Sequence, residues 1–172
     1  MGCVFNSAAP TVFPTGDTGD LIFGILNSSV VDAILECLSP TLNYQAGELR
    51  KIPIPHDPNL QEAVSPIVHS SVALARADWD NFETSWDFRD QPLLRPGLKG
   101  ATLEASWRNW EAQSTAAIRR MQELETENNR LFIAAYGLDG ELQPEVPEAQ
   151  ITLARAEARR DMAAFLSYAV GC

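Results

Sequence analysis

Two pairs of acidic residues stand close enough in the sequence to raise the question of acid–base catalysis. Asp78 and Asp80 lie two residues apart, and Asp87 and Asp90 lie three apart. General acid–base chemistry requires two carboxyl groups that converge on one substrate with pKa values pushed apart. Both pairs fall in or beside the aromatic stretch DWDNFETSWDF, whose spacing is helical. We therefore interpret them as surface groups or helix caps and predict no catalytic residue among them.

Histidine and cysteine offer little for metal or nucleophilic chemistry. The two histidines are His56 and His69, and the three cysteines, Cys3, Cys37 and Cys172, form no Cys-x-x-Cys pair. Zinc needs three or four convergent ligands, and neither histidine stands in a recognisable nucleophile context. We therefore predict no metal site. The odd cysteine count, without a signal peptide, indicates free thiols and a cytoplasmic protein.

Motifs for phosphate or cofactor binding are also missing from the sequence. The turn GDTGD at residues 16–20 lacks the Lys-Ser/Thr pair and the strand–loop–helix context of a phosphate-binding loop. Amino-methyltransferases hold the target amine in an Asn/Asp-Pro-Pro-Tyr/Phe loop. Asn43 and Tyr44 adjoin directly, with no prolines between them and no Gly-rich strand upstream. We therefore predict neither catalytic nor cofactor-binding residues in this chain.

The net charge of −10 restricts the classes of partner. A protein that binds DNA by itself carries a basic face, because phosphate contacts supply most of the non-specific affinity. DNA binding by this chain would need locally clustered arginines or a neighbouring domain. We disfavour a DNA mimic, since the acidic residues are spread along the chain rather than gathered in a dense row. The longest uncharged apolar run, residues 21–31, is too short to span a membrane, and we expect no membrane partner.

Residues 1–57 have the alternating short elements of a small α/β piece. Helices are predicted over residues 21–26 and 30–38, where apolar side chains recur at helical spacing. Pro53 and Pro55 confine the last predicted strand to a sheet edge, since proline cannot donate to a ladder. Four β-prone stretches predict strands, at residues 3–6, 11–13, 42–45 and 49–54.

Residues 58–101 are predicted to form a spacer helix and a connector. The helix spans residues 60–80 and is entered through Asp57 and Pro58. The connector at 89–101 is rich in proline and glycine and has the length to reverse the chain. Three aromatic residues at the end of the spacer helix and just beyond it are spaced three and four positions apart, so they are predicted to share one helical face. They are Trp79, Phe82 and Trp86.

Residues 102–172 are predicted to hold a long helix, a loop and a C-terminal helix. Thr102 caps the long helix and Gly137 ends it. Its apolar stripe is coiled-coil-like, and Asn128 takes a core position where a single Asn commonly fixes register. We predict that this helix packs antiparallel against the 60–80 helix or its aromatic extension. The stripe consists of Leu103, Trp107, Trp110, Ser114, Ala117, Met121, Leu124, Asn128, Leu131 and Ala135.

These elements predict an α+β, mostly helical chain. A small α/β N-terminal piece is followed by a long helical hairpin or coiled-coil-like spacer, with divisions at residues 1–57, 58–101 and 102–172. Both ends of the sequence fall inside regular elements, whereas natural termini are usually polar and loosely held. We therefore expect a truncated segment of a longer protein.

Four stretches resemble known families. LNSSVVDAILECLSPTLNYQAGELRKIPIP, residues 26–55, resembles the closing segment of target-recognition domains in restriction-modification enzymes. There a helix, a Leu-Asn-aromatic-Gln-x-Gly turn and an Ile-Pro-Ile strand lead into a spacer helix. ARADWDNFETSWDF, LETENNRLFIAAYGLDGEL and AFLSYAVGC are similar to the C-terminal part of the PglX-type adenine-specific DNA methyltransferases of BREX phage-defence systems.

The resemblance implies a parent enzyme that methylates adenine in an asymmetric DNA site with S-adenosylmethionine and so marks host DNA as self. The cofactor-binding and Asn-Pro-Pro-Tyr motifs of that family belong to an upstream domain that this sequence does not contain. For this chain the resemblance implies a non-catalytic recognition and spacer role. Residues 1–57 would then be the end of a target-recognition-like domain.

Candidate DNA contacts follow from this implied role and from side-chain chemistry. Asn and Gln suit adenine edges, while Lys and Arg suit phosphates. The alternative for the LNYQAG stretch is a structural turn in which the polar side chains bond the backbone. The candidates are Asn43, Gln45, Lys51, Arg119, Arg120, Arg155, Arg159 and Arg160.

A second hypothesis belongs to another class of function. The long amphipathic helix would pair with a protein of a defence complex, or with a second copy of the chain. DNA binding at low salt favours the recognition role, and stable protein pairing without DNA favours the interaction module.

Overall fold

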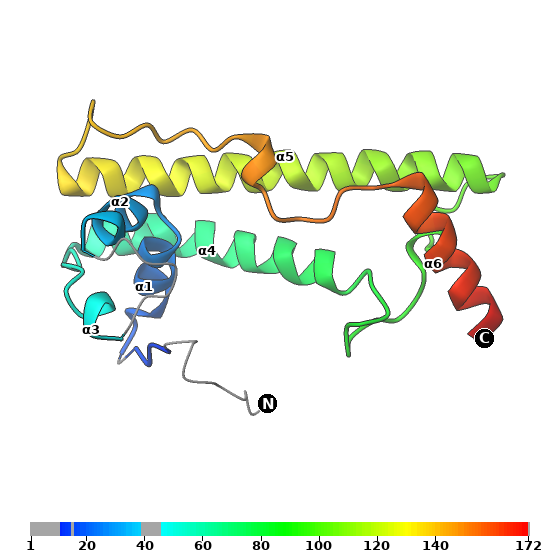
Figure 1. The fold of residues 1–172 in the computed structure, drawn as a ribbon, viewed down its shortest axis with the longest axis horizontal. Coiled ribbons are helices and arrows are strands. Elements are labelled where there is room, and N and C mark those ends of the chain that lie inside the picture. The colour runs from blue at the N-terminus through cyan, green and yellow to red at the C-terminus, as the bar shows by residue number, and fades with distance from the viewer. Residues whose placement is uncertain (1–10, 15, 39–45, 172) are drawn as a thin grey trace. The chain divides into compact units, whose positions relative to one another are not determined.

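The computed structural model of the chain describes residues 11–14, 16–38 and 46–171. These residues form six α-helices and two short 3₁₀ turns (Figure 1). The 3₁₀ turns are η1 (Pro92–Leu94) and η2 (Glu148–Gln150). The α-helices are α1 (Gly19–Leu26), α2 (Ser29–Leu38), α3 (Ala46–Leu49), α4 (Pro58–Trp79), α5 (Leu103–Tyr136) and α6 (Ala158–Gly171).

The mostly helical prediction is confirmed, but the described residues contain no strand and give no support to a small α/β piece. The predicted strands at 11–13 and 49–54 are wrong, and those at 3–6 and 42–45 lie outside the described residues. Around α3 the backbone turns back on itself, since Lys51 N–H donates to Glu48 O at 3.0 Å and Ile52 N–H to Leu49 O at 3.3 Å. β-branched residues favour a strand only where a partner strand and a shared face exist.

The chain divides into two compact units, and α4 and α5 each contribute residues to both. Unit 1 comprises the chain up to Ser70 together with Leu124–Glu145. Unit 2 comprises Ser71–Glu123 together with the chain from Val146 onward.

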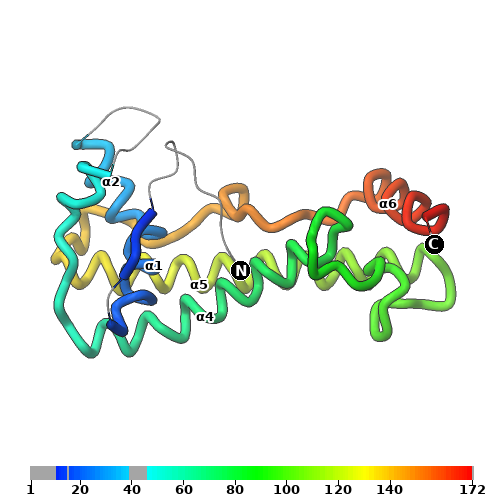
Figure 2. Tube along the Cα trace, turned by 90° about the horizontal axis from the view of Figure 1, so that it is seen from below, coloured from blue at the N-terminus to red at the C-terminus, as the bar shows by residue number. Residues whose placement is uncertain are grey.

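The core of unit 1 forms where α1 and α2 lie against the start of α4 and the end of α5 (Figure 2). Phe132 is fully buried there, with Leu60, Val64 and Val68 of α4 in the same cluster. These contacts pair the beginning of α4 with the end of α5, so the predicted antiparallel packing is found within unit 1. The other buried members are Leu21, Ile25, Val30, Val31, Leu35, Ile52 and Ile133.

Asn128 lies in this core, as its place in the stripe predicted, but its partner is a backbone group. Its Nδ2 donates to Gly24 O at 2.9 Å, next to the C-terminal end of α1. The neighbouring Asn129 accepts the N–H of Ser29 at 3.0 Å, at the start of α2. The two amides therefore hold the corner between α1 and α2, where Asn128 adds a second donor to a carbonyl that also accepts the N–H of Asn27.

The limits of α5 agree with the predicted caps. Thr102 Oγ1 accepts the N–H of Ala105 at 3.1 Å. At the other end Gly137 has φ +66°, and Leu138 N–H donates to Ile133 O at 2.9 Å. This is the Schellman arrangement, in which a left-handed residue lets the chain reverse and satisfies a terminal carbonyl.

The core of unit 2 joins α5 to the segment that follows Val146. Ile118 and Met121 of α5 pack with Ile151 and Leu153, and Leu74 of α4 lies against this cluster. Ser114 Oγ donates to Ala154 O at 2.8 Å, and Gln122 Nε2 donates to Val146 O at 2.7 Å. Polar side chains of α5 thus satisfy the carbonyls of a segment that has no ladder of its own.

The predicted helical face of Trp79, Phe82 and Trp86 is wrong. Helix α4 ends at Trp79, and residues 80–88 form successive turns in which Ser85 Oγ donates to Asp80 Oδ1 at 2.6 Å. Trp79 is 58% exposed and Trp86 is 93% exposed. Serine and aspartate side chains offer the backbone local partners that compete with a helix. The apolar face that α4 presents to α5 is made instead by its aliphatic residues.

Candidate functional site

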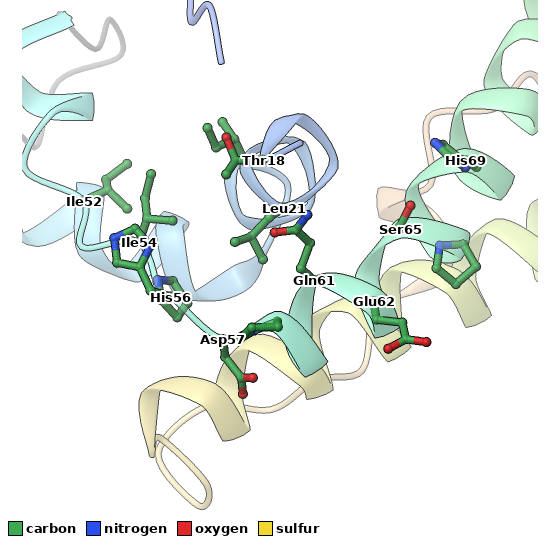
Figure 3. A pocket seen from close by; sticks show the side chains of 14 residues that line it. Thr18, Leu21, Ile52, Ile54, His56, Asp57, Gln61, Glu62, Ser65 and His69 are labelled. Atoms are coloured by element: carbon green, nitrogen blue, oxygen red, sulfur yellow. The ribbon is translucent and has the colours of Figure 1, made fainter. Parts of the chain in front are cut away.

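A large hollow in the described part of unit 1 is a groove between α1, residues 52–57 and the first half of α4 (Figure 3). Its volume is about 1070 Å³. Figure 3 shows Leu21 near its centre, with Ile52 and Ile54 on one side and Ser65 and His69 toward the other. We call this the α1–α4 groove. Its apolar lining consists of Leu21, Ile22, Ile52, Ile54, Pro55, Pro58 and Pro66, and its polar lining of Thr18, His56, Asp57, Gln61, Glu62, Ser65 and His69.

Helix α4 carries two adjacent stripes that build the groove. Its aliphatic stripe at residues 60, 64 and 68 enters the core, because positions four apart lie on one face. The polar stripe one residue further along holds the start of α1. Gln61 Nε2 donates to Asp17 O at 2.8 Å, and Ser65 Oγ donates to Asp20 Oδ2 at 2.5 Å. His69 Nε2 lies 3.1 Å from the same Asp20 oxygen.

The cluster of Ser65, Asp20 and His69 contains the side chains of a catalytic triad in the wrong order. A triad needs the serine to bond the histidine, and the histidine in turn to bond the carboxylate. Here the serine and the histidine both contact Asp20 Oδ2. Asp20 lies in the first turn of α1, where a carboxylate interacts favourably with the helix dipole. The cluster therefore fastens two helices and does not activate a nucleophile.

Asp161 is the buried charge of unit 2, and sequence reasoning missed it. It is 7% exposed, and its Oδ2 accepts the indole N–H groups of Trp107 and Trp110, each at 3.2 Å. The same oxygen accepts the N–H of Glu157 at 2.9 Å, which caps α6. Arg160 Nε lies 3.4 Å from Oδ1. A buried carboxylate with this many donors is satisfied, so it has a structural role.

Asp78, a member of the first acidic pair, is partly buried in unit 2. Burial raises the pKa of this carboxyl. The hydrogen bond from the N–H of Ala154 at 3.1 Å and the attraction of Arg160 act in the opposite direction and lower the pKa, but their effect is smaller. Asp80 accepts from Ser85, and Asp90 pairs with Arg95 at 2.8 Å. Asp80 and Asp90 thus have local partners, as expected of surface groups or caps, whereas half-buried Asp78 holds a backbone N–H 76 residues away in the sequence.

The predicted DNA contacts fall in both units. Asn43 and Gln45 lie outside the described residues, and Lys51 is exposed in the turn after α3. The five arginines are all exposed and all belong to unit 2. Arg119 and Arg120 flank the α5 side of the unit 2 core, where Ile118 and Met121 pack with Ile151 and Leu153, and Arg155, Arg159 and Arg160 follow that segment.

Three of these arginines already have partners. Arg120 pairs with Glu123 at 3.0 Å, and Arg155 donates to the carbonyls of Ile151 and Glu148. Arg160 donates to the carbonyl of Arg155 and lies beside Asp161. Arg119 and Arg159 form no hydrogen bond or ion pair with any residue that the structure describes. Their guanidinium groups are the ones available to an external anion.

Charge is distributed unequally between the units. Unit 1 holds 12 of the 23 acidic residues and three of the 13 basic ones, which leaves a net charge of −9. Unit 2 holds the other 11 acidic and 10 basic residues, which leaves −1. The sequence contained this information, but the division became visible only when the fold assigned residues 124–145 to the same unit as the N-terminal helices.

Three further properties of the described residues concern metal ligands, membrane-spanning helices and free thiols. They contain no group of three His, Cys, Asp or Glu side chains arranged to hold a metal ion. None of the helices in the described ranges is by itself long and apolar enough to cross a membrane, although α1 and α2, bent by 67°, together have that length and composition. Cys37 is an exposed free thiol, and Cys3 and Cys172 lie outside the described residues.

The chain is homologous to adenine-specific methyltransferases. It is 34% identical to the adenine-specific methyltransferase PglX of Lacticaseibacillus casei (strain Zhang) over 178 residues, which cover 99% of this chain and 14% of that protein. It is 28% identical to the adenine-specific methyltransferase BrxX of Escherichia coli O9:H4 (strain HS) over 113 residues, which cover 64% of this chain and 9% of that protein. No family model matches the chain.

These matches confirm the resemblance to PglX-type enzymes that the sequence motifs indicated. They extend over nearly the whole chain in the case of PglX, so the homology is not confined to one motif. The chain spans only a small part of the length of both relatives.

Proposed function

We propose that this chain is a non-catalytic part of an adenine-specific DNA methyltransferase of a BREX or related phage-defence system, where it contributes to target recognition and spacing. The observation that carries the proposal is the 34% identity to PglX across 99% of the chain. The reaction itself belongs to the parent enzyme, which transfers a methyl group from S-adenosylmethionine to adenine. The cofactor site also belongs to the parent, since this sequence has neither the Gly-rich strand nor the Asn-Pro-Pro-Tyr loop.

Unit 2 is the part of the chain that fits an approach to DNA. It carries 10 of the 13 basic residues and a net charge of only −1, whereas unit 1 carries −9 and repels phosphates. Within unit 2, Arg119 and Arg159 have no intramolecular partner among the described residues. An arginine already paired with a carboxylate gains little from a phosphate, because one ion pair replaces another.

The second hypothesis, pairing through the long helix, has less support. The apolar face of α5 is used inside the chain itself, in the cores of unit 1 and of unit 2. Trp110, Met121, Leu124 and Phe132 are each at most 6% exposed. A helix face already buried in this way has little apolar area left for a partner.

DNA binding by the isolated chain tests the recognition role. Fluorescence anisotropy of a labelled 30-base-pair duplex should give a dissociation constant on the order of 100 μM at about 25 mM salt, and no measurable binding at about 150 mM salt. The double variant Arg119→Ala/Arg159→Ala should weaken low-salt binding about fivefold, because two phosphate contacts are lost.

The matched control is Arg108→Ala/Arg130→Ala. Both control residues are exposed on α5, and both are paired with glutamates, Glu104 and Glu127, at 2.5 and 2.6 Å. The control changes the net charge by the same amount and should weaken binding less than twofold. Equal loss in the two double variants would mean that only the total charge matters, and absence of low-salt binding would overturn the recognition role of this chain.

A further inference from the structure

The α1–α4 groove combines an apolar floor with an acidic rim, and the proposed recognition function does not use it. Leu21 and Ile52 lie deepest, at 3% and 7% exposure, while Ile54 is 38% exposed on the wall. Exposed apolar surface rimmed by polar groups is typical of a site that another molecule covers.

Two carboxylates at the rim have no cation to balance them. Asp57 Oδ1 accepts the N–H of Asn59 at 2.9 Å, and Glu62 forms no ion pair or hydrogen bond with any described residue. Both side chains line the groove and both residues are exposed (Figure 3). Asp57 directly precedes α4 and Glu62 lies in its second turn, so a cation from a partner could reach both carboxylates from solvent.

The apolar floor continues beyond the groove. A second hollow of about 440 Å³ shares Ile22, Ile52 and Ile54 with the first and is lined further by Phe13, which is 77% exposed. The two hollows therefore adjoin along α1 and residues 52–54 and share part of their apolar lining. Adjoining apolar hollows offer room for several side chains of one chain segment.

The charge of the surrounding unit identifies the kind of occupant. A net charge of −9 on unit 1 opposes DNA and RNA and attracts cations. Among the described residues that line the two hollows, Arg50 is the one Lys or Arg, and the groove adds two histidines. A segment with apolar side chains flanked by Lys or Arg would complement both the floor and the rim.

The mixture of polar and apolar lining points to a reversible contact with a separate protein. Permanently buried interfaces are more apolar and resemble a core cut in half, whereas reversible ones have polar, solvent-accessible rims. Seven of the 14 described residues that line the groove are polar, including Gln61, Ser65 and both histidines. We propose that the α1–α4 groove docks a basic segment of a partner protein, with apolar side chains on the floor and Lys or Arg side chains at Asp57 and Glu62.

Binding of defined peptides to the 172-residue chain tests this proposal. The probe is a fluorescein-labelled peptide, Lys-Lys-Leu-Ala-Leu-Lys-Lys, followed by anisotropy at about 100 mM salt. It should bind with a dissociation constant on the order of 100 μM. Replacing both leucines by serine, or the four lysines by glutamate, should abolish measurable binding, because the first removes the apolar contacts and the second reverses the charge.

Matched variants of the chain locate the site. Glu62→Lys should weaken binding of the lysine–leucine peptide at least fivefold, whereas Glu36→Lys, an exposed change of equal charge in α2 of the same unit, should weaken it less than twofold. Ile54→Ser should weaken it similarly, whereas Leu38→Ser, at a residue of similar exposure outside both hollows, should not. Circular dichroism of each variant confirms that the helices are retained.

Several outcomes would overturn the proposal. Equal loss in Glu62→Lys and Glu36→Lys would mean that the peptide senses only the overall charge of unit 1. Equal binding of the serine peptide would exclude the apolar floor. Binding of a DNA duplex that is lost in Ile54→Ser would assign the groove to nucleic acid. The double variant Arg119→Ala/Arg159→Ala should leave peptide binding unchanged. Failure of the peptide to bind the groove can therefore be distinguished from failure of the recognition role proposed for unit 2.

Discussion

Trp110 donates its indole N–H to Oδ2 of Asp161 across 3.2 Å, and this bond joins the first half of α5 to the start of α6. Both residues are buried, and Trp107 donates to the same oxygen. The carboxylate therefore sits where two indoles and the N–H of Glu157 converge. Such a group is stable only while all its donors remain, because a charge buried without partners costs several kcal/mol.

Removing this carboxylate should destabilise unit 2. Asp161→Ala leaves two indole N–H groups and one backbone N–H without their acceptor, and we expect a loss of about 3 kcal/mol in the free energy of unfolding. Urea denaturation followed by tryptophan fluorescence measures it. Arg159→Ala, two residues away and exposed, is the control and should change stability by less than about 0.5 kcal/mol. Equal stability of Asp161→Ala and the parent chain would contradict the structural role.

The four tryptophans should differ sharply in their contribution to stability. Trp110 is 5% exposed, and Trp110→Ala should cost about 3–5 kcal/mol through loss of contacts and a cavity. Trp86 is 93% exposed, so Trp86→Ala should change stability by less than about 0.5 kcal/mol. Melting curves at two protein concentrations serve as a further check. A melting temperature that rises with concentration would indicate that α5 pairs two chains instead of packing within one.

Gly24 should tolerate no side chain. A Cβ at this position would lie 2.6 Å from Val64 Cγ1, 3.0 Å from Asn128 Oδ1 and 3.2 Å from Phe132 Cε2. Gly24→Ala should therefore destabilise the chain by about 1–3 kcal/mol despite the higher helix propensity of alanine. Gly47→Ala in α3 is the control, since a Cβ there would have no other side chain or distant backbone atom within 4 Å, and it should be neutral or slightly stabilising. Similar melting temperatures for both variants would disprove close packing of α1.

Glu125 and Glu127 should affect the pH dependence of stability with opposite sign. Burial raises the pKa of Glu125 in the folded chain, so folding favours its protonated form and ionisation at neutral pH is destabilising. Glu125→Gln should raise the melting temperature at pH 7. The gain should shrink as the pH falls through the raised pKa, where the parent glutamate takes up its proton.

Glu127 provides the opposite case. The hydrogen bond from Arg130, at 2.8 Å, lowers the pKa of Glu127, so its stabilising contribution is present at neutral pH and is lost as the pH falls through the lowered pKa. Glu127→Gln should therefore lower the melting temperature slightly at pH 7 and have no effect in strong acid. Melting curves between pH 2 and pH 7 measure both variants. A gain from Glu125→Gln that grows toward low pH would contradict the predicted sign.

Several features of this protein follow from the sequence alone because they depend on neighbours along the chain. Thr102 and Gly137 mark the ends of α5 through hydrogen bonds that reach three to five residues. The apolar spacing of α1, α2 and α4 similarly predicts helices, since residues four apart share a face. The family resemblance also rests on contiguous stretches, and the identity to PglX extends it to nearly the whole chain.

Tertiary structure decided the features that depend on distant residues. Asn128 has the spacing of a coiled-coil core residue, yet its partner is the carbonyl of Gly24, 104 residues away in the sequence. Trp79 and Trp86 have the types and spacing of core residues, yet the turns at 80–88 leave them exposed. The α1–α4 groove exists because Gln61, Ser65 and His69 hold α1 against α4. Periodicity specifies which face of a helix is apolar, but burial depends on which other segment covers that face, and that choice is made by the whole chain.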